Sequence, residues 1–402
     1  MKIAAIITEY NPFHNGHEYQ IKKTREILGE DTAIIAIMSG NFTQRGEPAI
    51  ADKLIRAAAA AECGVNLILE LPFPYSMTSA EFFARSGVRI AERLGVVDYL
   101  VFGSECGDIE LLSKIAENMS SKEFTDTLYE RESSNPTLGH AALCEAVYKE
   151  LYGNIPKGFF TSNNILALEY IKALLAEESD ITPLTIKREG GDYTSNFTAG
   201  TELQSATAIR EMMSANFDSA LDYVPKNAKL IYKKAISSGE MPIVADRLDA
   251  AVISYFRLNS PSDECNIHDA MGGLYNRLCD VSMTASTISS LTSMTETKKY
   301  TTARIRRAIW SSFLGVTSST VRELPAFTQV LAMDTVGRSL LKRIKKMSDF
   351  TVLTKPSSYK TCDEQVVRQV ELSAKADSVF DLCRKKPISG RYSLKLTPYV
   401  KE

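Results

Sequence analysis

The most informative part of the chain is residues 1–29, MKIAAIITEYNPFHNGHEYQIKKTREILG. Residues 2–7 form a short apolar run rich in β-branched side chains, which is typical of a strand buried on both faces of a parallel sheet. A polar loop follows, and the apolar spacing over 17–28 then predicts a helix that ends at Gly29. The chain is therefore predicted to begin with a strand, a loop and a helix.

The same alternation continues through the first hundred residues. Apolar runs predict further strands at 32–38, 65–69 and 99–102, and helical patterns end near residue 61 and span 79–94. Strands that alternate with helices indicate a doubly wound, Rossmann-like α/β domain with a parallel sheet. Ligands of such folds bind at the carboxyl ends of the strands, so the polar residues after each strand are candidates for a binding site.

The later part of the chain has a different pattern. Residues 105–180 are predicted to be mainly helical, and a short strand is predicted at 182–186. From residue 205 onward the pattern is helix-like, with polar linkers and a less regular tail. We therefore expect a Rossmann-like domain over residues 1–215, followed by a mainly α-helical domain over residues 216–402.

Composition restricts the class of protein. The 402 residues are 44% hydrophobic and 24% charged, which excludes a disordered or collagen-like chain. The 47 Lys and Arg against 49 Asp and Glu give a net charge of -2, so nucleic-acid binding would require a local basic patch. The seven Cys form no C-x-x-C pair, which argues against a disulfide framework. With no signal-peptide pattern and no apolar run of about 20 residues, we expect a cytoplasmic protein without a membrane span.

Two of the four histidines, His14 and His17, flank Asn15 and Gly16 at the predicted start of the first helix. A helix start offers free backbone N–H groups and a positive dipole end, where anions bind. Imidazoles three positions apart lie on the same side and can donate hydrogen bonds to phosphate oxygens during phosphoryl displacement. Gly16 leaves room for a flat ring against the backbone. We predict that His14 and His17 act on a phosphate; the alternative is a coincidental pair of capping or surface histidines.

This turn resembles the HxGH-bearing nucleotidyltransferase superfamily, whose members transfer adenylyl groups from ATP. Longer stretches are similar to the bacterial tRNA(Met) cytidine acetate ligase family, and together they cover most of the chain except its C-terminal tail. They are residues 7–17 (ITEYNPFHNGH), 38–49 (MSGNFTQRGEPA), 69–72 (LELP), 102–105 (FGSE), 162–170 (SNNILALEY), 187–189 (KRE) and 300–307 (YTTARIRR).

The resemblance implies a two-step reaction. Acetate and ATP, with Mg²⁺ accompanying the ATP, form acetyladenylate and release pyrophosphate. The acetyl group then passes to N4 of the wobble cytidine of elongator tRNA(Met), giving N4-acetylcytidine. The resemblance also implies that His14 and His17 are catalytic, and no Cys, His or Asp spacing predicts a metal site of the protein's own. The ATP-binding residues that it implies are Ile7, Thr8, Glu9, Tyr10, Asn11, Pro12, Phe13, His14, Asn15, Gly16, His17, Gly103, Asn163, Arg188, Ser205 and Thr207.

Some of these residues have a second interpretation. Gly103 is either a ligand contact or an ordinary turn glycine, Asn163 either contacts the nucleoside or caps a helix, and Arg188 either binds phosphate or is solvent-exposed. The stretch from Ser205 to Arg210 resembles the superfamily's second signature, which holds the β- and γ-phosphates. It departs from that signature at residue 206, an alanine where a second hydroxyl is common, and a plain capped helix is the alternative.

Polar residues after the first three predicted strands also have two interpretations. Arg45 and Lys53 are either ligands of acetate or the α-phosphate, or part of a solvated helix face. Glu9 and Glu70 either orient water or Mg²⁺, or are structural carboxylates.

The late part of the chain contains a basic segment. Residues 298–346 hold eleven Lys and Arg against two acids, whereas residues 105–150 hold ten acids against four bases. Taken alone, the segment is more typical of a solvated basic helix surface than of an RNA-binding surface. RNA recognition requires phosphate-binding cations together with planar groups, and both occur here. With the resemblance, we predict the tRNA-binding residues Lys298, Lys299, Arg304, Arg307, Lys342 and Arg343.

Two other functions remain open at this point. A metabolic adenylyltransferase of cofactor biosynthesis would need the same histidine turn but no RNA site. An RNA-binding protein with a vestigial nucleotide fold would neither bind nor turn over ATP. The absence of G-x-x-x-x-G-K-[ST] argues against a P-loop ATPase.

Overall fold

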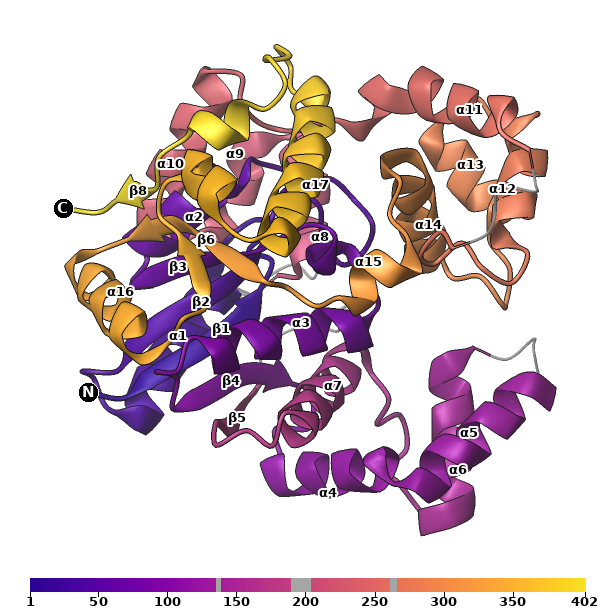
Figure 1. Ribbon diagram of the computed structural model, residues 1–402, viewed down its shortest axis with the longest axis horizontal. Helices are drawn as coiled ribbons and strands as arrows, with labels where there is room; N and C mark the ends of the chain where they lie inside the picture. The colour runs from indigo at the N-terminus through magenta and orange to yellow at the C-terminus, as the bar shows by residue number, and fades with distance from the viewer. Residues whose placement is uncertain (135–138, 189–203, 261–265) are drawn as a thin grey trace.

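The computed structural model describes residues 1–134, 139–188, 204–260 and 266–402, and an eight-stranded sheet forms its centre (Figure 1). The strands are β1 Ile3–Thr8, β2 Ala33–Ser39, β3 Leu67–Leu71, β4 Tyr99–Ser104, β5 Thr182–Lys187, β6 Phe327–Met333, β7 Thr351–Leu353 and β8 Tyr399–Val400. Their order is β5-β4-β1-β2-β3-β6-β7, and β8 pairs with β6. Strands β1 to β5 pair in parallel, whereas β6 runs antiparallel to β3.

Helices surround this sheet. The α-helices of the described residues are α1 Asn15–Leu28, α2 Lys53–Glu62, α3 Ala80–Arg93, α4 Ile109–Ser120, α5 Lys122–Ser134, α6 His140–Tyr152, α7 Ser162–Ala176, α8 Ala206–Ala215, α9 Phe217–Ala220, α10 Lys226–Ser237, α11 Asp249–Leu258, α12 Leu274–Ser282, α13 Ile288–Thr295, α14 Thr302–Leu314, α15 Ser318–Arg322, α16 Thr335–Met347 and α17 Glu364–Phe380. The 3₁₀ helices are η1 Tyr75–Met77, η2 Leu221–Tyr223, η3 Ala245–Leu248, η5 Pro356–Thr361, η6 Asp381–Cys383 and η7 Tyr392–Lys395.

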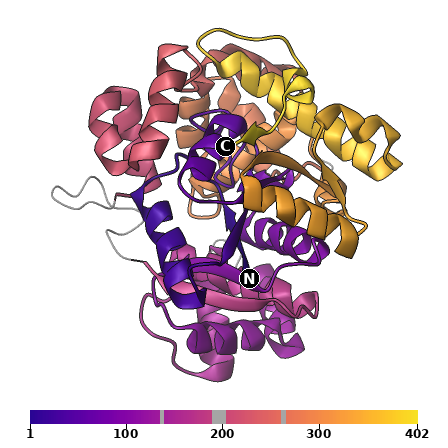
Figure 2. The same ribbon diagram turned by 90° about the vertical axis from the view of Figure 1, so that its left-hand side faces the viewer.

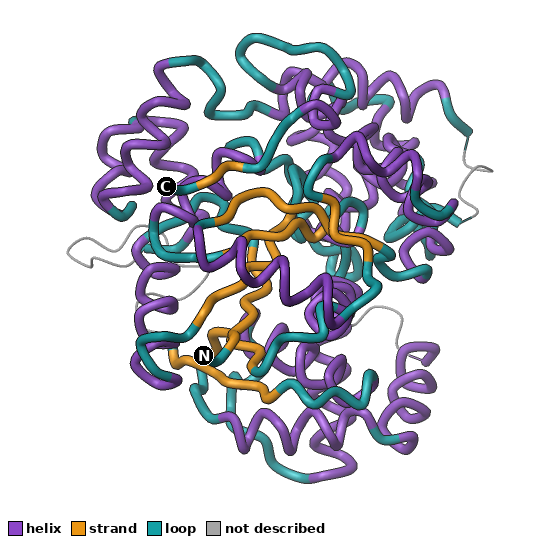
Figure 3. Tube along the Cα trace, turned by 60° about the vertical axis from the view of Figure 1, so that its left-hand side comes forward, coloured by secondary structure: helices purple, strands orange, loops and turns teal. Residues whose placement is uncertain are grey.

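Both faces of the sheet are covered, as Figure 3 shows by the helices on either side of the strands. Successive strand residues point to opposite faces. In β1, Ile3, Ala5 and Ile7 pack with α3, α4, α7 and α16, whereas Ala4 and Ile6 pack with α1, α2, α8 and α10. The predicted doubly wound α/β domain is therefore confirmed. The parallel strands β1, β2, β4 and β5 end at one common edge, where the candidate site lies.

The C-terminal half contributes more to the sheet than the sequence predicted. Strands β6, β7 and β8 were not expected, and β6 extends the N-terminal sheet by pairing with β3. The short run FTQVLAM lies in a basic, helix-rich segment, and its partner strand is far away in the sequence, so no local pattern marks the pairing. The predicted boundary near residue 215 stays a prediction, but the sheet itself spans both halves of the chain.

Two helical groups extend from the core. Helices α11 to α14 pack around the buried Trp310, and α5 and α6 form a hairpin that projects from the body (Figure 1). The two chain ends lie on the same side of the molecule (Figure 2). No helix in the described ranges is both long enough and apolar enough to cross a membrane.

Candidate active site

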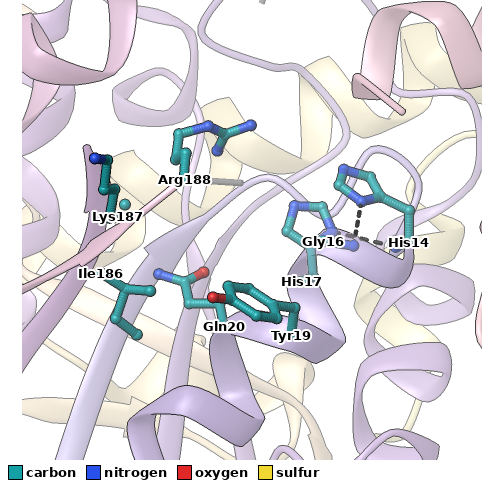
Figure 4. A pocket seen from close by; sticks show the side chains of 9 residues that line it. His14, Gly16, His17, Tyr19, Gln20, Ile186, Lys187 and Arg188 are labelled. Atoms are coloured by element: carbon teal, nitrogen blue, oxygen red, sulfur yellow. Dashed lines mark hydrogen bonds between the residues drawn. The ribbon is translucent and has the colours of Figure 1, made fainter. Parts of the chain in front are cut away.

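A cleft opens at the carboxyl edge of the sheet, beside β1, β4 and β5 and the first turns of α1, α7 and α8. It consists of two cavities that share His14, His17, Gln20, Gly103 and Arg188. We call one the Lys187 end, which also contains Gly16, Tyr19, Ile186 and Lys187 (Figure 4). The other is the Tyr170 end, which also contains Ile7, Thr8, Glu9, Tyr10, Asn11, Gln44, Phe83, Phe102, Asn163, Leu166, Tyr170 and Ala206. Most of the predicted ATP-binding residues are therefore brought together.

His14 and His17 form a stacked pair at the start of α1. The ring centroids lie 3.8 Å apart. Nδ1 of His14 accepts the backbone N–H of Gly16 at 3.1 Å, and Nδ1 of His17 accepts the backbone N–H of His14 at 3.2 Å (Figure 4). Because backbone N–H groups only donate, each neutral ring carries its proton on Nε2. His14 thus caps the helix, and both rings also keep an Nε2–H group that is not used by these bonds.

The electrostatic surroundings keep both rings neutral. Burial, and then the charges of Arg188 and Arg210, lower the pKa of His14 to about 3. Burial also lowers the pKa of His17 well below its ordinary value, and His14 and Arg188 act in the same direction. An anion held between these rings and Arg188 would meet neutral donors and the cation of an exposed arginine.

The two glycines of the site are closely approached by the side chains of His14 and Arg188. A Cβ built on Gly16 would lie 2.9 Å from Cε1 of His14, so the flat ring against this backbone is the ring of His14. A Cβ built on Gly103 would lie 3.3 Å from Cγ of Arg188. The absence of a Cβ at Gly103 therefore allows the Arg188 side chain to lie across the end of β4. An ordinary turn glycine would not need such a neighbour.

Five predicted ATP-binding residues do not line the cleft: Pro12, Phe13, Asn15, Ser205 and Thr207. Phe13 is buried, and its backbone N–H donates to Tyr232 at 2.8 Å. The Asn15 side chain donates to the backbone of Asp222 at 3.4 Å.

At the start of α8, the Ser205 hydroxyl caps the helix by accepting the N–H of Ala208 at 3.2 Å. Thr207 accepts from Arg210, and Arg210 also donates to the backbone oxygen of Asn11 at 3.0 Å. This helix start therefore abuts the histidine turn, but Ala206 is the residue that reaches the cleft.

Asn163 lines the Tyr170 end and is held by Glu105. Its side-chain amide donates to Oε1 of Glu105 at 2.6 Å, and its backbone N–H donates to the same atom at 3.2 Å. The backbone N–H of Asn164 donates to Oε2 of Glu105 at 2.8 Å. Glu105 thus caps α7, and the interpretation of Asn163 as the capping side chain is wrong.

Lys53 takes neither role considered for it. It is buried, and its Nζ lies 2.7 Å from Glu70 and 2.8 Å from Asp377 of α17. Burial lowers the pKa of Lys53, but the two carboxylates outweigh burial and raise the pKa above its ordinary value. Lys53 and Glu70 are structural, whereas Glu9 lines the cleft and accepts the backbone N–H of Gln44 at 2.8 Å.

The predicted tRNA-binding residues fall into two separate groups. Lys299, Arg304 and Arg307 line a further cavity, here called the α14 cavity, which also contains Ser79, Ala80, Glu81, Glu132, Gly139, His140, Leu143, Ile165, Glu169, Asp269 and Thr301. Arg307 is largely buried in an ion pair with Asp269 at 2.7 Å and donates to the backbone oxygen of Gln44 at 3.3 Å. It is therefore part of the scaffold.

The second group is remote from the first. Lys342 and Arg343 are exposed on α16, which lies across the molecule from α14 (Figure 1). The end of α16 is anchored to the end of α3, because the hydroxyl of Ser348 donates to the backbone oxygen of Arg93. This contact lies at the edge of the sheet opposite the cleft, so the two groups do not form one continuous surface.

Several cleft residues were not among those predicted: Phe83, Phe102, Leu166, Tyr170 and Lys187. Phe102, Leu166 and Tyr170 lie inside stretches that carry the family resemblance, but an apolar side chain in a helix or strand normally indicates core. Glu189, the last residue of the stretch 187–189, lies outside the described residues. Within the described residues, no group of three or more His, Cys, Asp or Glu side chains is arranged to hold a metal ion.

Comparisons with known proteins agree with this geometry. The family model described as HIGH Nucleotidyl Transferase matches residues 1–393. A tRNA(Met) cytidine acetate ligase of Acetivibrio thermocellus is 36% identical over 401 residues, covering 96% of each chain. A tRNA(Met) cytidine acetate ligase of Caldanaerobacter subterraneus subsp. tengcongensis is 36% identical over 390 residues, again covering 96% of each chain. The crystal structure of Thermotoga maritima TmcAL bound with alpha-thio ATP superposes with a TM-score of 0.91 at 29% identity, covering 100% of this chain and 99% of the other.

Proposed function

The chain belongs to the HIGH nucleotidyl transferase family and, within it, to the tRNA(Met) cytidine acetate ligases, and we propose that it joins acetate to a tRNA cytidine at the expense of ATP. The observation that carries the chemistry is the stacked pair of neutral imidazoles beside Arg188. The similarity to proteins named tRNA(Met) cytidine acetate ligase supports this function over the alternative, a metabolic adenylyltransferase that uses no RNA substrate.

In the first step, an acetate oxygen attacks the α-phosphorus of ATP, and the bond from that phosphorus to the pyrophosphate oxygen breaks. Negative charge grows on the departing pyrophosphate and on the α-phosphate oxygens. The Nε2–H groups of His14 and His17 and the guanidinium of Arg188 provide donors for this charge, and such donors typically contribute about 2.7–4 kcal/mol each. Gly103 and Arg188 line both ends of the cleft, and we propose that the nucleoside lies beside them at the Lys187 end.

In the second step, N4 of the cytidine attacks the acetyl carbonyl, the acyl–phosphate bond breaks and AMP leaves. The α14 cavity supports this step because it adjoins the Tyr170 end. Helix α3 contributes Ala80 to the α14 cavity and Phe83 to the cleft, and α7 contributes Glu169 and Tyr170 in the same way. We infer that the target nucleotide enters through the α14 cavity, with Lys298, Lys299 and Arg304 near its phosphates.

Mg²⁺ is proposed to enter with ATP. Mg²⁺ at nucleotide sites is held chiefly by phosphate oxygens and water, with one or two protein carboxylates at most. Glu9 is a carboxylate that lines the cleft and fits this limited role. A cytoplasmic location follows from the proposed substrates, since tRNA and ATP are both abundant there.

The direct test is acetate-dependent exchange between ATP and labelled pyrophosphate, measured with and without tRNA(Met). We expect exchange with acetate alone, and acetyl incorporation into tRNA(Met) once it is added. Exchange without incorporation into any tRNA would favour the adenylyltransferase alternative. Absence of both ATP binding and turnover would leave only the RNA-binding alternative.

A further inference from the structure

The two ends of the cleft differ in chemistry. The Lys187 end is lined by His14, His17, Gln20, Lys187 and Arg188 together with the apolar side chains of Ile186 and Tyr19. The Tyr170 end has one continuous apolar side that we call the apolar wall, formed by Ile7, Phe83, Phe102, Leu166 and Tyr170. An apolar surface inside a cleft that binds a triphosphate requires an apolar part of a substrate to cover it.

The position of the wall matches the place of the nucleophile in the proposed first step. His14, His17 and Arg188 line both ends of the cleft, so a phosphate bound to them lies between the two ends. If the nucleoside occupies the Lys187 end, the attacking carboxylate must approach from the Tyr170 end. The wall therefore lies behind the attacking group.

Charge at the Tyr170 end fixes how a carboxylate would lie. Glu9 contributes a carboxylate of its own to this end, which repels a second anion, whereas Arg188 and the imidazole donors, which line the same end, attract one. A short carboxylic acid is therefore most stable with its carboxylate toward His14 and Arg188 and its alkyl group against the wall.

The wall is packed so that it resists widening. Phe83 and Tyr170 are both 2% exposed, and Phe102 and Tyr170 pack with ring centroids 5.5 Å apart. Ile7 is pressed by α3, because a Cβ built on Gly87 would lie only 2.7 Å from Cδ1 of Ile7. A close-packed surface of this kind discriminates alkyl groups by size.

Tyr170 adds a polar group to the wall. Its hydroxyl is buried and has no hydrogen-bond partner among the residues that the structure describes. Burial, with the nearby charge of Glu9, raises the pKa of Tyr170, so the hydroxyl stays protonated and can donate. Leaving such a group unpaired is costly, and a substrate oxygen would relieve that cost.

We propose that the apolar wall is the acyl-binding site, which holds the methyl group of acetate and excludes longer carboxylic acids, and that the hydroxyl of Tyr170 donates to the carboxylate of the acid. This assignment rests on the proposed function, since it presupposes activation of a carboxylate by ATP. It makes Phe83 and Leu166 determinants of chain length and makes Tyr170 a positioning residue.

The test compares acids of increasing length in the ATP–pyrophosphate exchange assay. We expect Leu166→Ala to raise the ratio of kcat/KM for propionate over acetate by about tenfold or more, as expected when a cavity the size of one or two methylenes is opened. Phe83→Ala should extend the gain to butyrate. Ile186→Ala, at the Lys187 end, is the matched control and should change KM for ATP but not the ratio between acids.

Tyr170→Phe tests the hydroxyl without removing the ring. We expect KM for acetate to rise about tenfold while KM for ATP is unchanged, as for loss of one hydrogen bond to a charged group. Melting temperatures of all variants identify any that fail to fold. Leu166→Ala is the variant expected to fold most readily, because Leu166 is only half-buried. An unchanged acid ratio in folded, active Leu166→Ala would overturn the assignment, whereas no acetate-dependent exchange in the wild type would instead overturn the proposed function.

Discussion

At the scale of single residues, the histidine pair combines two tasks in two rings. Nδ1 of each ring satisfies a backbone N–H group of the first helical turn, and Nε2 retains the proton needed by a phosphate. Backbone bonds thus fix the tautomer that the chemistry requires. The neutral state matters as well, because a protonated Nδ1 would lose its backbone bond.

We expect His14→Ala and His17→Ala each to slow acetyladenylate formation by about tenfold to a thousandfold, as for loss of a donor to a developing charge. Single-turnover formation of the adenylate is the measurement. His14→Asn separates catalysis from capping, because Asn is a good helix cap but does not reproduce the Nε2 donor. His140→Ala should leave the rate unchanged. Wild-type rates in both alanine variants would contradict the assigned role.

The lowered histidine pKa values predict a specific titration. NMR signals of the His14 and His17 rings should not titrate between pH 5 and 8 in the unliganded protein, since both rings are already neutral. His140 is the internal control, because its contacts with Cys144 and Glu132 raise its pKa to about 9, so its signals should titrate when the pH is raised beyond 8 while those of the pair stay unchanged. A midpoint near 6.5 for either ring of the pair would refute the neutral pair.

The same shifts affect stability with a definite sign. Below the ordinary histidine pKa of about 6.5, His14 and His17 become protonated in the unfolded chain, whereas in the folded protein both rings stay neutral. The free energy of unfolding should therefore fall as the pH drops from about 6.5 toward 3. His17→Asn should flatten this dependence in thermal melts between pH 7.5 and 5.5, and an equally steep dependence in the variant would contradict the assignment.

Residues of the site differed in how well the sequence predicted them. The HxGH turn was predictable because capping and anion binding at a helix start depend on neighbours within a few positions. Lys53 was not, because its partner Asp377 comes from the other end of the chain. Phe83 and Tyr170 were missed because apolar lining and apolar core look the same in sequence.

At the scale of elements, a buried charge network joins α2, β3 and α17. Lys53→Met removes the cation that Glu70 and Asp377 share, and leaves Asp377 with only the hydrogen bond from Asn41 at 2.9 Å. Loss of one member of a buried ion network costs about 3–5 kcal/mol. Chemical denaturation should report a loss of this size, and Lys22→Met, which breaks the exposed pair with Glu18, should cost less than about 1 kcal/mol. Equal effects from the two variants would show that the network contributes little.

Secondary structure was predictable where it depended on local apolar runs. Strands β1 to β5 were all expected, with ends displaced by one or two residues. Helix α8 begins at Ala206 and is capped by Ser205, as the capping pattern predicted. Strand β6 was missed because its stability depends on pairing with β3 rather than on its own sequence.

At the scale of the whole molecule, the two basic groups lie on different sides. We expect the double reversal Lys298→Glu and Lys299→Glu to lower kcat/KM for tRNA by about tenfold or more, with acetate-dependent exchange retained. The same reversal at Lys342 and Arg343 should have a smaller effect, because α16 lies beyond the sheet from the cleft. Salt dependence distinguishes lost phosphate contacts from misfolding, since each lost contact reduces the slope by about one. If the two double reversals lowered kcat/KM for tRNA equally, or if neither lowered it, the assignment of the tRNA site to the α14 side would be contradicted.

The antiparallel pairing of β6 with β3 has a consequence for synthesis of the chain. As the protein leaves the ribosome, β1 to β5 emerge long before residues 327–333, so β3 remains an open edge during most of translation. Open edges recruit other strands, and pairings between distant segments form slowly. The nascent N-terminal half is therefore the aggregation-prone species, and a chain truncated before β6 would present His14 and His17 on a sheet whose strand β3 is still unpaired at its outer edge.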